Sequence, residues 1–186
     1  GAVTAAGWLA WRAWGGASPE AAGPFVVVSI DSLRVDRVSA YGSHRIRTPA
    51  IDSLAADGVL FERAWAHVPQ TLPAHVSMLS GLLPFEHGVR HESGFVVGPE
   101  IPLVQEDFRR FGYATAGVVS SFLLRADTGL ARGFDWYEDR VPDPLDSGQT
   151  HRAGDASLAA VRHWLDRQTL PRFLLFLHLD EPRSPP

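Results

Sequence analysis

A nearly unbroken run of β-branched residues, Phe25–Ile30, constrains the fold more than any other feature of the sequence. Such runs are typical of strands buried on both faces of a parallel sheet that helices cover. Residues 113–120 and 173–179 are similarly apolar and predict two further core strands. Because parallel strands need crossover connections, we expect helices between these runs.

Four segments between these apolar runs carry helical patterns. Thr48 and Gly58 are typical of the start and end of a helix, and Ile51 and Leu54 share one face of it. The alternation of helices with strands predicts a layered α/β/α fold around a mostly parallel central sheet. The predicted helices are 48–58, 73–82, 102–111 (apolar side chains Leu103, Val104, Phe108 and Phe111) and 155–168 (Leu158, Val161, Trp164 and Leu165 facing inward); 59–66 is predicted to be a strand or extended segment and 141–149 a surface loop.

The composition excludes several classes of function. Hydrophobic residues make up 45% and charged residues 20% of the chain, which is enough apolar material for a globular core. The net charge of -4 gives no support for nucleic-acid binding. The chain contains no Cys, which excludes disulfides, thiolate metal sites and a Cys nucleophile.

The ends of the chain suggest a fragment of a longer protein. Residue 1 is Gly and the only Met is Met78, so no initiator is present. Residues 1–24 are predicted to be a lead-in to the domain 25–186. The Trp-rich stretch 1–16 is shorter than the roughly 20 apolar residues that span a bilayer. It is interpreted as the remnant of a signal peptide or membrane anchor, or equally as a surface helix or disordered lead-in.

Asp31 follows the first predicted strand directly. In open α/β sheets, ligands bind beyond the carboxyl ends of the strands, so a carboxylate there is well placed to hold a divalent cation. The alternative is that Asp31 and Ser32 only cap the following turn, because both residue types favour such positions.

Thr71 and His75 form a second candidate constellation at the start of a predicted helix. A helix N-terminus offers free N–H groups and a positive dipole, which suit an anionic ester. A threonine hydroxyl is a weak nucleophile unless a base or a metal lowers its pKa, and a cation held by Asp31 would do so. His75, one turn along, could contact ester oxygens or donate a proton. The alternative interpretation is that Thr71 is an N-cap.

Two stretches around these residues, VVVSIDSLRVDRVSAYG and TPAIDSLAADGVLFERAWAHVPQTLPAHVSMLSGLLPFEHGV, resemble the sulfatase family of the alkaline phosphatase superfamily. FGYATAGVV, GLARGFDWYED and FLLFLHLDEP fit the same family pattern in order. The resemblance implies an alkaline-phosphatase-like fold, present as an N-terminal part of the catalytic domain. It implies that Asp31 and Thr71 bind a divalent cation (Ca, Mg, Mn or Zn), that Thr71 is the nucleophile, and that His75 contacts it or the ester. His178 matches a substrate-contacting position, or is a hydrogen-bonded histidine at a strand end.

Several positions depart from the family pattern. Ser32 stands where sulfatases have a second Asp, and Thr71 where they have a Cys or Ser that becomes formylglycine. Ser120 and Phe122 replace the usual Lys and His, and Arg183 replaces a later His. A threonine with one metal-binding Asp resembles the phosphodiesterase, phosphonate hydrolase and phosphoglycerol or phosphoethanolamine transferase relatives, which use Thr directly.

The resemblance therefore implies a metal-dependent hydrolase of sulfate or phosphate esters that works through a covalent Thr71 intermediate. Its substrates would be small-molecule, glycan or lipid-headgroup esters, in a periplasmic, extracellular or membrane-anchored protein. The alternatives are a membrane-associated phosphoglycerol- or phosphoethanolamine-type transferase and a non-catalytic sulfatase-like module. Because the family completes its metal site further downstream, we expect the 186 residues alone to be inactive.

Overall fold

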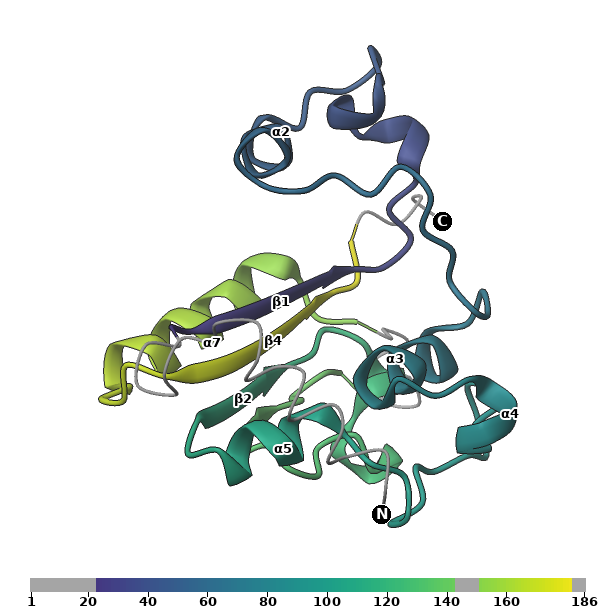
Figure 1. Cartoon of the computed structure of the whole chain (residues 1–186), viewed down its shortest axis with the longest axis vertical. Helices are drawn as coiled ribbons and strands as arrows, with labels where there is room; N and C mark the ends of the chain where they lie inside the picture. The colour runs from purple at the N-terminus through teal and green to yellow at the C-terminus, as the bar shows by residue number, and fades with distance from the viewer. Residues whose placement is uncertain (1–22, 143–150, 182–186) are drawn as a thin grey trace, which may run out of the picture.

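Four parallel strands form the central sheet of the protein. The computed structural model describes residues 23–142 and 151–181. The strands are β1 (Phe25–Ile30), β2 (Ala114–Val118), β3 (Trp136–Glu138) and β4 (Phe173–Leu179), in the spatial order β1-β4-β2-β3 (Figure 1). Each neighbouring pair is parallel, as predicted for an α/β protein.

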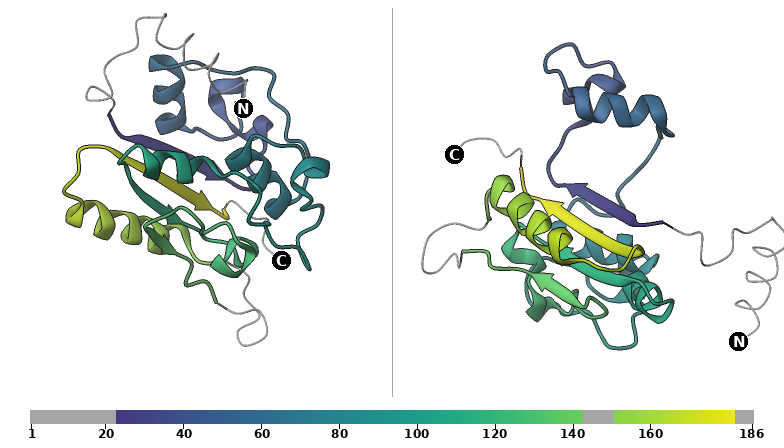
Figure 2. Two further views of the ribbon diagram at one scale, coloured as in Figure 1. Left: turned by 60° about the horizontal axis from the view of Figure 1, so that its bottom comes forward. Right: turned by 90° about the vertical axis from the view of Figure 1, so that its left-hand side faces the viewer.

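Helices cover the two faces of this sheet. In β4, Leu174 and Phe176 belong to a core that also contains residues of α3 (Thr71–Ser80). Leu175 and Leu177 point to the opposite face, where they pack with Val161 of α7 (Gly154–Arg167). The views in Figure 2 show α7 on one side of the sheet and the other helices of the body on the opposite side. The predicted α/β/α layering is therefore confirmed.

All four predicted helices are present, with shifted boundaries, and β1 and β4 have the predicted bounds. β3 was not predicted, because three residues are too few to show a periodic pattern. The remaining elements are α2 (Pro49–Asp57), α4 (Pro84–His87), α5 (Val104–Arg110), η2 (Val35–Arg37), η3 (Ser39–Tyr41), η4 (Phe122–Leu124) and η5 (Ala126–Thr128).

The prediction that Phe25–Ile30 is buried on both faces is wrong for the described part of the chain. Val26 and Val28 are 55% and 50% exposed. They share the sheet face of Leu175 and Leu177, but β1 is the edge strand there and α7 packs on β4 and β2. The β-branched run thus identified the strand and not its neighbours.

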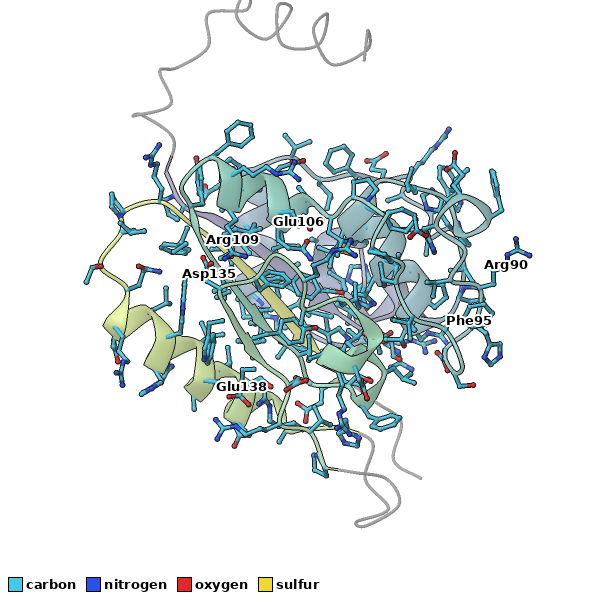
Figure 3. The ribbon with its side chains drawn as sticks, turned by 90° about the horizontal axis from the view of Figure 1, so that it is seen from below. Arg90, Phe95, Glu106, Arg109, Asp135 and Glu138 are labelled. Atoms are coloured by element: carbon cyan, nitrogen blue, oxygen red, sulfur yellow. The ribbon has the colours of Figure 1, made fainter. Side chains whose placement is uncertain are left out.

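The inward faces predicted for two helices are confirmed in part: Leu103 is buried, and Phe108 and Trp164 pack against the two buried cores, as predicted. In α5, Val104 and Phe111 are exposed, while Gln105 is fully buried and donates to the carbonyl oxygens of Leu130 and Arg132. In α7, Val161 is buried as predicted, but Leu158 and Leu165 are exposed. Arg109 at the end of α5 also forms an exposed ion pair with Asp135 before β3, at 3.0 Å (Figure 3).

Residues between β1 and α3 form an arm that projects from the sheet (Figure 1). Helix α2 has no buried residue, and Leu54 on its predicted inward face is 75% exposed. Residues 59–66, predicted to be a strand or an extended segment, do not form a strand and are exposed. Thr48 occupies the N-cap position but does not cap the backbone; its hydroxyl binds Ser39 and Asp52 instead.

Parts of two predicted segments lie outside the described residues, namely 1–22 of the lead-in and most of the loop at 141–149. In the part of the chain that the structure describes, no helix has the length and apolar character that crossing a bilayer requires.

Candidate active site

The candidate site lies at the carboxyl edge of the sheet, where Asp31 follows β1. The Asp31 backbone N–H donates to the carbonyl oxygen of Leu179 at 2.8 Å, which extends the β1–β4 pairing by one residue. Ser32 has a φ of 60°, in the left-handed region that non-glycine residues seldom adopt. Its N–H donates to Asp31 Oδ1 at 2.8 Å. This tight turn fixes one carboxylate oxygen and leaves the other for a second contact.

Thr71 provides that contact. Its hydroxyl donates to Asp31 Oδ2 at 2.7 Å, across 40 positions of sequence. Thr71 is the first residue of α3, which begins two residues earlier than predicted because Pro73 is tolerated in the first turn, where no intrahelical N–H bond is needed. Gln70, not Thr71, occupies the N-cap position. The structure therefore brings together the two residues that the sequence singled out.

His75 lies behind Thr71 with both ring nitrogens engaged. Nδ1 is 2.7 Å from the carbonyl oxygen of Thr71 and Nε2 is 2.8 Å from the hydroxyl of Ser29. Because a carbonyl only accepts, Nδ1 carries the proton and Nε2 accepts from Ser29. Burial, more than the neighbouring His178, lowers the pKa of His75 to about 4. The predicted contact of His75 with an ester oxygen would require one of these bonds to break.

His178 is the second-last residue of β4 and is fully buried. The N–H of Ser120 donates to its Nδ1 at 3.4 Å, and the Ser120 hydroxyl donates to its carbonyl oxygen at 2.8 Å. The proton therefore resides on Nε2, which lies 3.7 Å from Asp31 Oδ2. That distance exceeds a hydrogen bond, so this nitrogen has no hydrogen-bond partner among the described residues. The ring also packs edge-on against His75, at 4.8 Å between centroids.

These neighbours set the charge of Asp31. The adjacent His178 ring contributes most, and with the Thr71 hydroxyl it holds the pKa of the Asp31 carboxyl well below its usual range, against the opposing effect of burial. Asp31 is therefore ionised at neutral pH. It is also a weak base, so it orients the Thr71 hydroxyl more readily than it deprotonates it.

A second carboxylate, Glu92, reaches Thr71 from another side. Its Oε1 accepts the backbone N–H of Thr71 at 3.0 Å. Glu92 comes from the loop after α4, between Arg90 and Phe95, which Figure 3 shows away from α7. It shares a cleft of about 710 Å³ with Asp31 and Thr71, and none of the described residues that line this cleft is Lys or Arg.

Three residues of the site were not predicted in these roles from the sequence: Ser29, Ser120 as a hydrogen-bond donor to His178, and Glu92. Ser29 had a signal, because it is the one hydroxyl in an otherwise apolar run and lies two positions before Asp31, on the same face of the strand. Glu92 had none, since a loop carries it 21 residues beyond Thr71.

The side chains present fit part of a divalent-cation site. The Asp31 carboxylate and the Thr71 hydroxyl are hard oxygen donors of the type that Ca²⁺, Mg²⁺ and Mn²⁺ prefer, and Zn²⁺ also accepts carboxylates. No group of three or more His, Cys, Asp or Glu side chains among residues 23–142 and 151–181 is arranged to hold a metal ion. Asp31 and Thr71 would thus supply a share of the coordination that such an ion needs.

Asp31 follows the first strand and Thr71 begins a helix, which are the places that the family resemblance implied for them. The sulfatase family model, described as "Sulfatase", matches residues 24–186. This chain belongs to the sulfatase family. Its fold is accordingly of the alkaline phosphatase type.

Individual sulfatases and their structural relatives show the same likeness. A Delta 4,5-hexuronate-2-O-sulfatase of Bacteroides thetaiotaomicron is 32% identical over 125 residues, which cover 65% of this chain and 25% of that protein. The solved structure of a protein in complex with its substrate, D-glucosamine-2-N,6-O-disulfate, matches this chain with a TM-score of 0.74 at 19% identity. The match covers 87% of this chain and 35% of the chain of that protein. The phosphonate monoester hydrolase of Agrobacterium radiobacter has a TM-score of 0.67 at 20% identity, over 85% of this sulfatase-family chain and 41% of its own.

The chain spans only a part of these relatives. The matched regions cover 19% and 25% of the first two curated relatives, an arylsulfatase of Clostridium perfringens and the hexuronate sulfatase. The structural likenesses, at about a fifth identity, establish the fold.

Proposed function

We propose that the protein to which this chain belongs hydrolyses sulfate or phosphate esters by direct attack of Thr71. The observation that carries this proposal is the 2.7 Å hydrogen bond from the Thr71 hydroxyl to Asp31, at the first residue of a ten-residue helix. The dipole of such a helix end favours an anionic group. Residues 25–186 would then be the N-terminal portion of the catalytic domain, which the family match over 24–186 supports.

The reaction divides into two displacements. Thr71 loses its hydroxyl proton, its oxygen forms a bond to the sulfur or phosphorus, and the ester oxygen leaves and takes up one proton. Water then attacks the same centre, and the Thr71 oxygen leaves and regains a proton. Before the first step, Asp31 accepts the hydrogen bond of the Thr71 hydroxyl and thereby orients it. Because the proton affinity of Asp31 is low, its carboxylate stays ionised.

A divalent cation (Ca, Mg, Mn or Zn), held in part by Asp31 and Thr71, would lower the pKa of the hydroxyl and neutralise charge on the ester oxygens. The remaining residues position Thr71. His75, which Ser29 holds in turn, donates to the Thr71 carbonyl oxygen, while Glu92 accepts the Thr71 N–H. His178 places an N–H beside Asp31 and keeps the carboxylate ionised.

The threonine at position 71 also supports placing the protein in the subgroup of relatives in which a threonine attacks the ester directly. Formylglycine forms from Cys or Ser, whereas a threonine hydroxyl in contact with a carboxylate can attack without prior oxidation. The substrates we propose are small-molecule, glycan or lipid-headgroup esters. The relatives named for hexuronate and glucosamine sulfates and for phosphonate monoesters support this range.

The test replaces the nucleophile in the full-length protein. We expect Thr71→Ala to lower kcat by about a thousandfold or more for aryl sulfate and aryl phosphate diester substrates. Thr71→Ser keeps the hydroxyl and should retain turnover. Acid quenching of the wild-type reaction should leave a sulfo or phospho group on the peptide that contains Thr71. Unchanged turnover in Thr71→Ala would exclude Thr71 as the nucleophile.

A further inference from the structure

Glu92 occupies the position at the start of α3 that an anionic ester would be expected to use. The Thr71 N–H to which it binds belongs to the first turn of the helix, where no intrahelical acceptor exists. A carboxylate satisfies this N–H in the way that a sulfate or phosphate oxygen would. An ester placed for attack by the Thr71 hydroxyl would therefore lie directly against the Glu92 carboxylate.

The charge on this side of the cleft is negative. Asp31 contacts the Thr71 hydroxyl and Glu92 contacts the Thr71 N–H, so two carboxylates flank one residue. None of the described lining residues is Lys or Arg, and Arg is the sole basic residue type other than His in the sequence. The buried Nε2 of His178 faces the same Asp31 carboxylate at 3.7 Å and has no hydrogen-bond partner among the described residues.

We propose that Glu92 determines specificity by charge, so that the site accepts monoanionic esters, namely sulfate monoesters and phosphate diesters, in preference to dianionic phosphate monoesters. This inference rests on the proposed function, because it places the ester at Thr71. The repulsion from one fixed carboxylate is proportional to the charge of the ligand, and a dianion experiences twice the unfavourable energy of a monoanion at the same position.

A single substitution isolates this charge. Glu92→Gln keeps an oxygen that accepts the Thr71 N–H and removes one negative charge. Glu62→Gln makes the same change in net charge at an exposed position outside the cleft, and is the matched control. Both are made in full-length protein that also carries Thr71→Ala, so that ligands are bound without being consumed.

The probes are phenyl sulfate and diphenyl phosphate as monoanions and phenyl phosphate as the dianion. The measurement is made by calorimetry at about pH 8, which lies above the second phosphate pKa of about 6. The Coulomb energy doubles with ligand charge. If Glu92→Gln increases the affinity for the monoanions about fivefold, it should therefore increase the affinity for the dianion about 25-fold. In the wild-type background, the ratio of kcat/KM for phenyl phosphate to that for phenyl sulfate should rise in the same direction.

Three outcomes would overturn the proposal: equal changes for all three probes, the same changes in Glu62→Gln, or no binding of any probe to either protein. A loss of divalent-cation affinity in Glu92→Gln without the charge-dependent ratio would also overturn it, and would assign Glu92 to the cation. The binding ratio does not depend on turnover. Failure of the proposed function would therefore appear separately, as full activity of Thr71→Ala in the otherwise wild-type protein.

Discussion

The position of Thr71 depends on two side chains behind it, of which His75 also lines the cleft. Ser29, on β1, binds His75, and His75 binds the carbonyl oxygen of Thr71 one turn earlier in α3. His75 is only 5% exposed, so each of its ring nitrogens must find its partner within the protein. This pair links the strand that carries Asp31 to the helix that carries Thr71.

Removal of the Ser29 hydroxyl tests this link. We expect Ser29→Ala to lower the free energy of unfolding by about 1–3 kcal/mol, because Nε2 of His75 would stay buried without a partner. Ser93→Ala, at an exposed position, should change it by less than about 0.5 kcal/mol. Urea denaturation of both variants measures the difference. Equal stability of the two would show that Ser29 contributes nothing to the position of His75.

A second buried contact at the residue scale, between Glu138 and Arg152, predicts a dependence of stability on pH. Glu138 is 6% exposed and lies 2.9 Å from Arg152 and 2.6 Å from Arg140. Hydrogen bonds from Arg140, followed by the charges of both arginines, lower the pKa of Glu138 against the effect of its burial. Because the folded-state pKa is below the unfolded one, its contribution is fully present above the unfolded pKa. It is lost as the pH falls toward the folded value.

Glu138→Gln should therefore be less stable than the wild type at neutral pH, by about 3 kcal/mol, because the largely buried Arg152 loses its counter-charge. The difference should shrink as the pH falls below about 4.5, where the unfolded glutamate becomes protonated. Chemical denaturation from neutral pH to about pH 3 measures this convergence. A constant difference across that range would show that the ionised form of Glu138 does not contribute to stability.

At the scale of the elements, the contact of β2 with β3 depends on a residue without a side chain. A Cβ built on Gly117 would lie 2.5 and 2.6 Å from ring carbons of Tyr137, which is shorter than real contacts allow. Tyr137 cannot easily withdraw, because its hydroxyl donates to the carbonyl oxygen of Leu124 at 2.7 Å. The short third strand is thus held by an aromatic ring that lies over a glycine.

Gly117→Ala should accordingly lower the free energy of unfolding by about 1–3 kcal/mol through overpacking. Gly23→Ala is the matched control, because a Cβ there meets no atom within 4 Å. Thermal unfolding of the two variants provides the comparison. If Gly117→Ala were as stable as the control, the packing of the Tyr137 ring on β2 would be wrong.

The type of most elements followed from the sequence, whereas the directions of their side chains followed only in part. The apolar run predicted β1, but the exposure of Val26 and Val28 depends on which strand lies beside it. In α5, the buried Gln105 lies beside the apolar residues because its amide donates to two carbonyl oxygens of a distant loop. Periodicity counts apolar side chains and gives no weight to a polar one that finds its partners only after folding.

At the scale of the whole molecule, the arm between β1 and α3 differs from the body that carries the sheet. Trp65, Val59 and Phe61 are 79%, 79% and 70% exposed, and α2 buries no residue. Segments with so few buried contacts open at a low cost in free energy.

Limited trypsin digestion of the 186-residue chain should therefore cut in the arm, after Arg45, Arg47 or Arg63, before it cuts after Arg132. Arg132 is the internal comparison, because it binds Glu106 and the carbonyl oxygens of Gly98 and Ile101. Mass spectrometry of the earliest fragments identifies the cleavage sites. A first cut after Arg132 would contradict this order.

The sequence by itself determined the α/β class, the family, and the choice of Asp31 and Thr71. Strand-forming runs, helix ends and ordered motifs are local patterns, and each is written in adjacent residues. The tertiary structure alone decided that the Thr71 hydroxyl meets Asp31 Oδ2, that Ser29 and His75 lie behind it, and that Glu92 occupies the helix end. These contacts join residues 21 to 46 positions apart, and only the packing of α3 against the carboxyl edge of the parallel sheet brings them within hydrogen-bond distance.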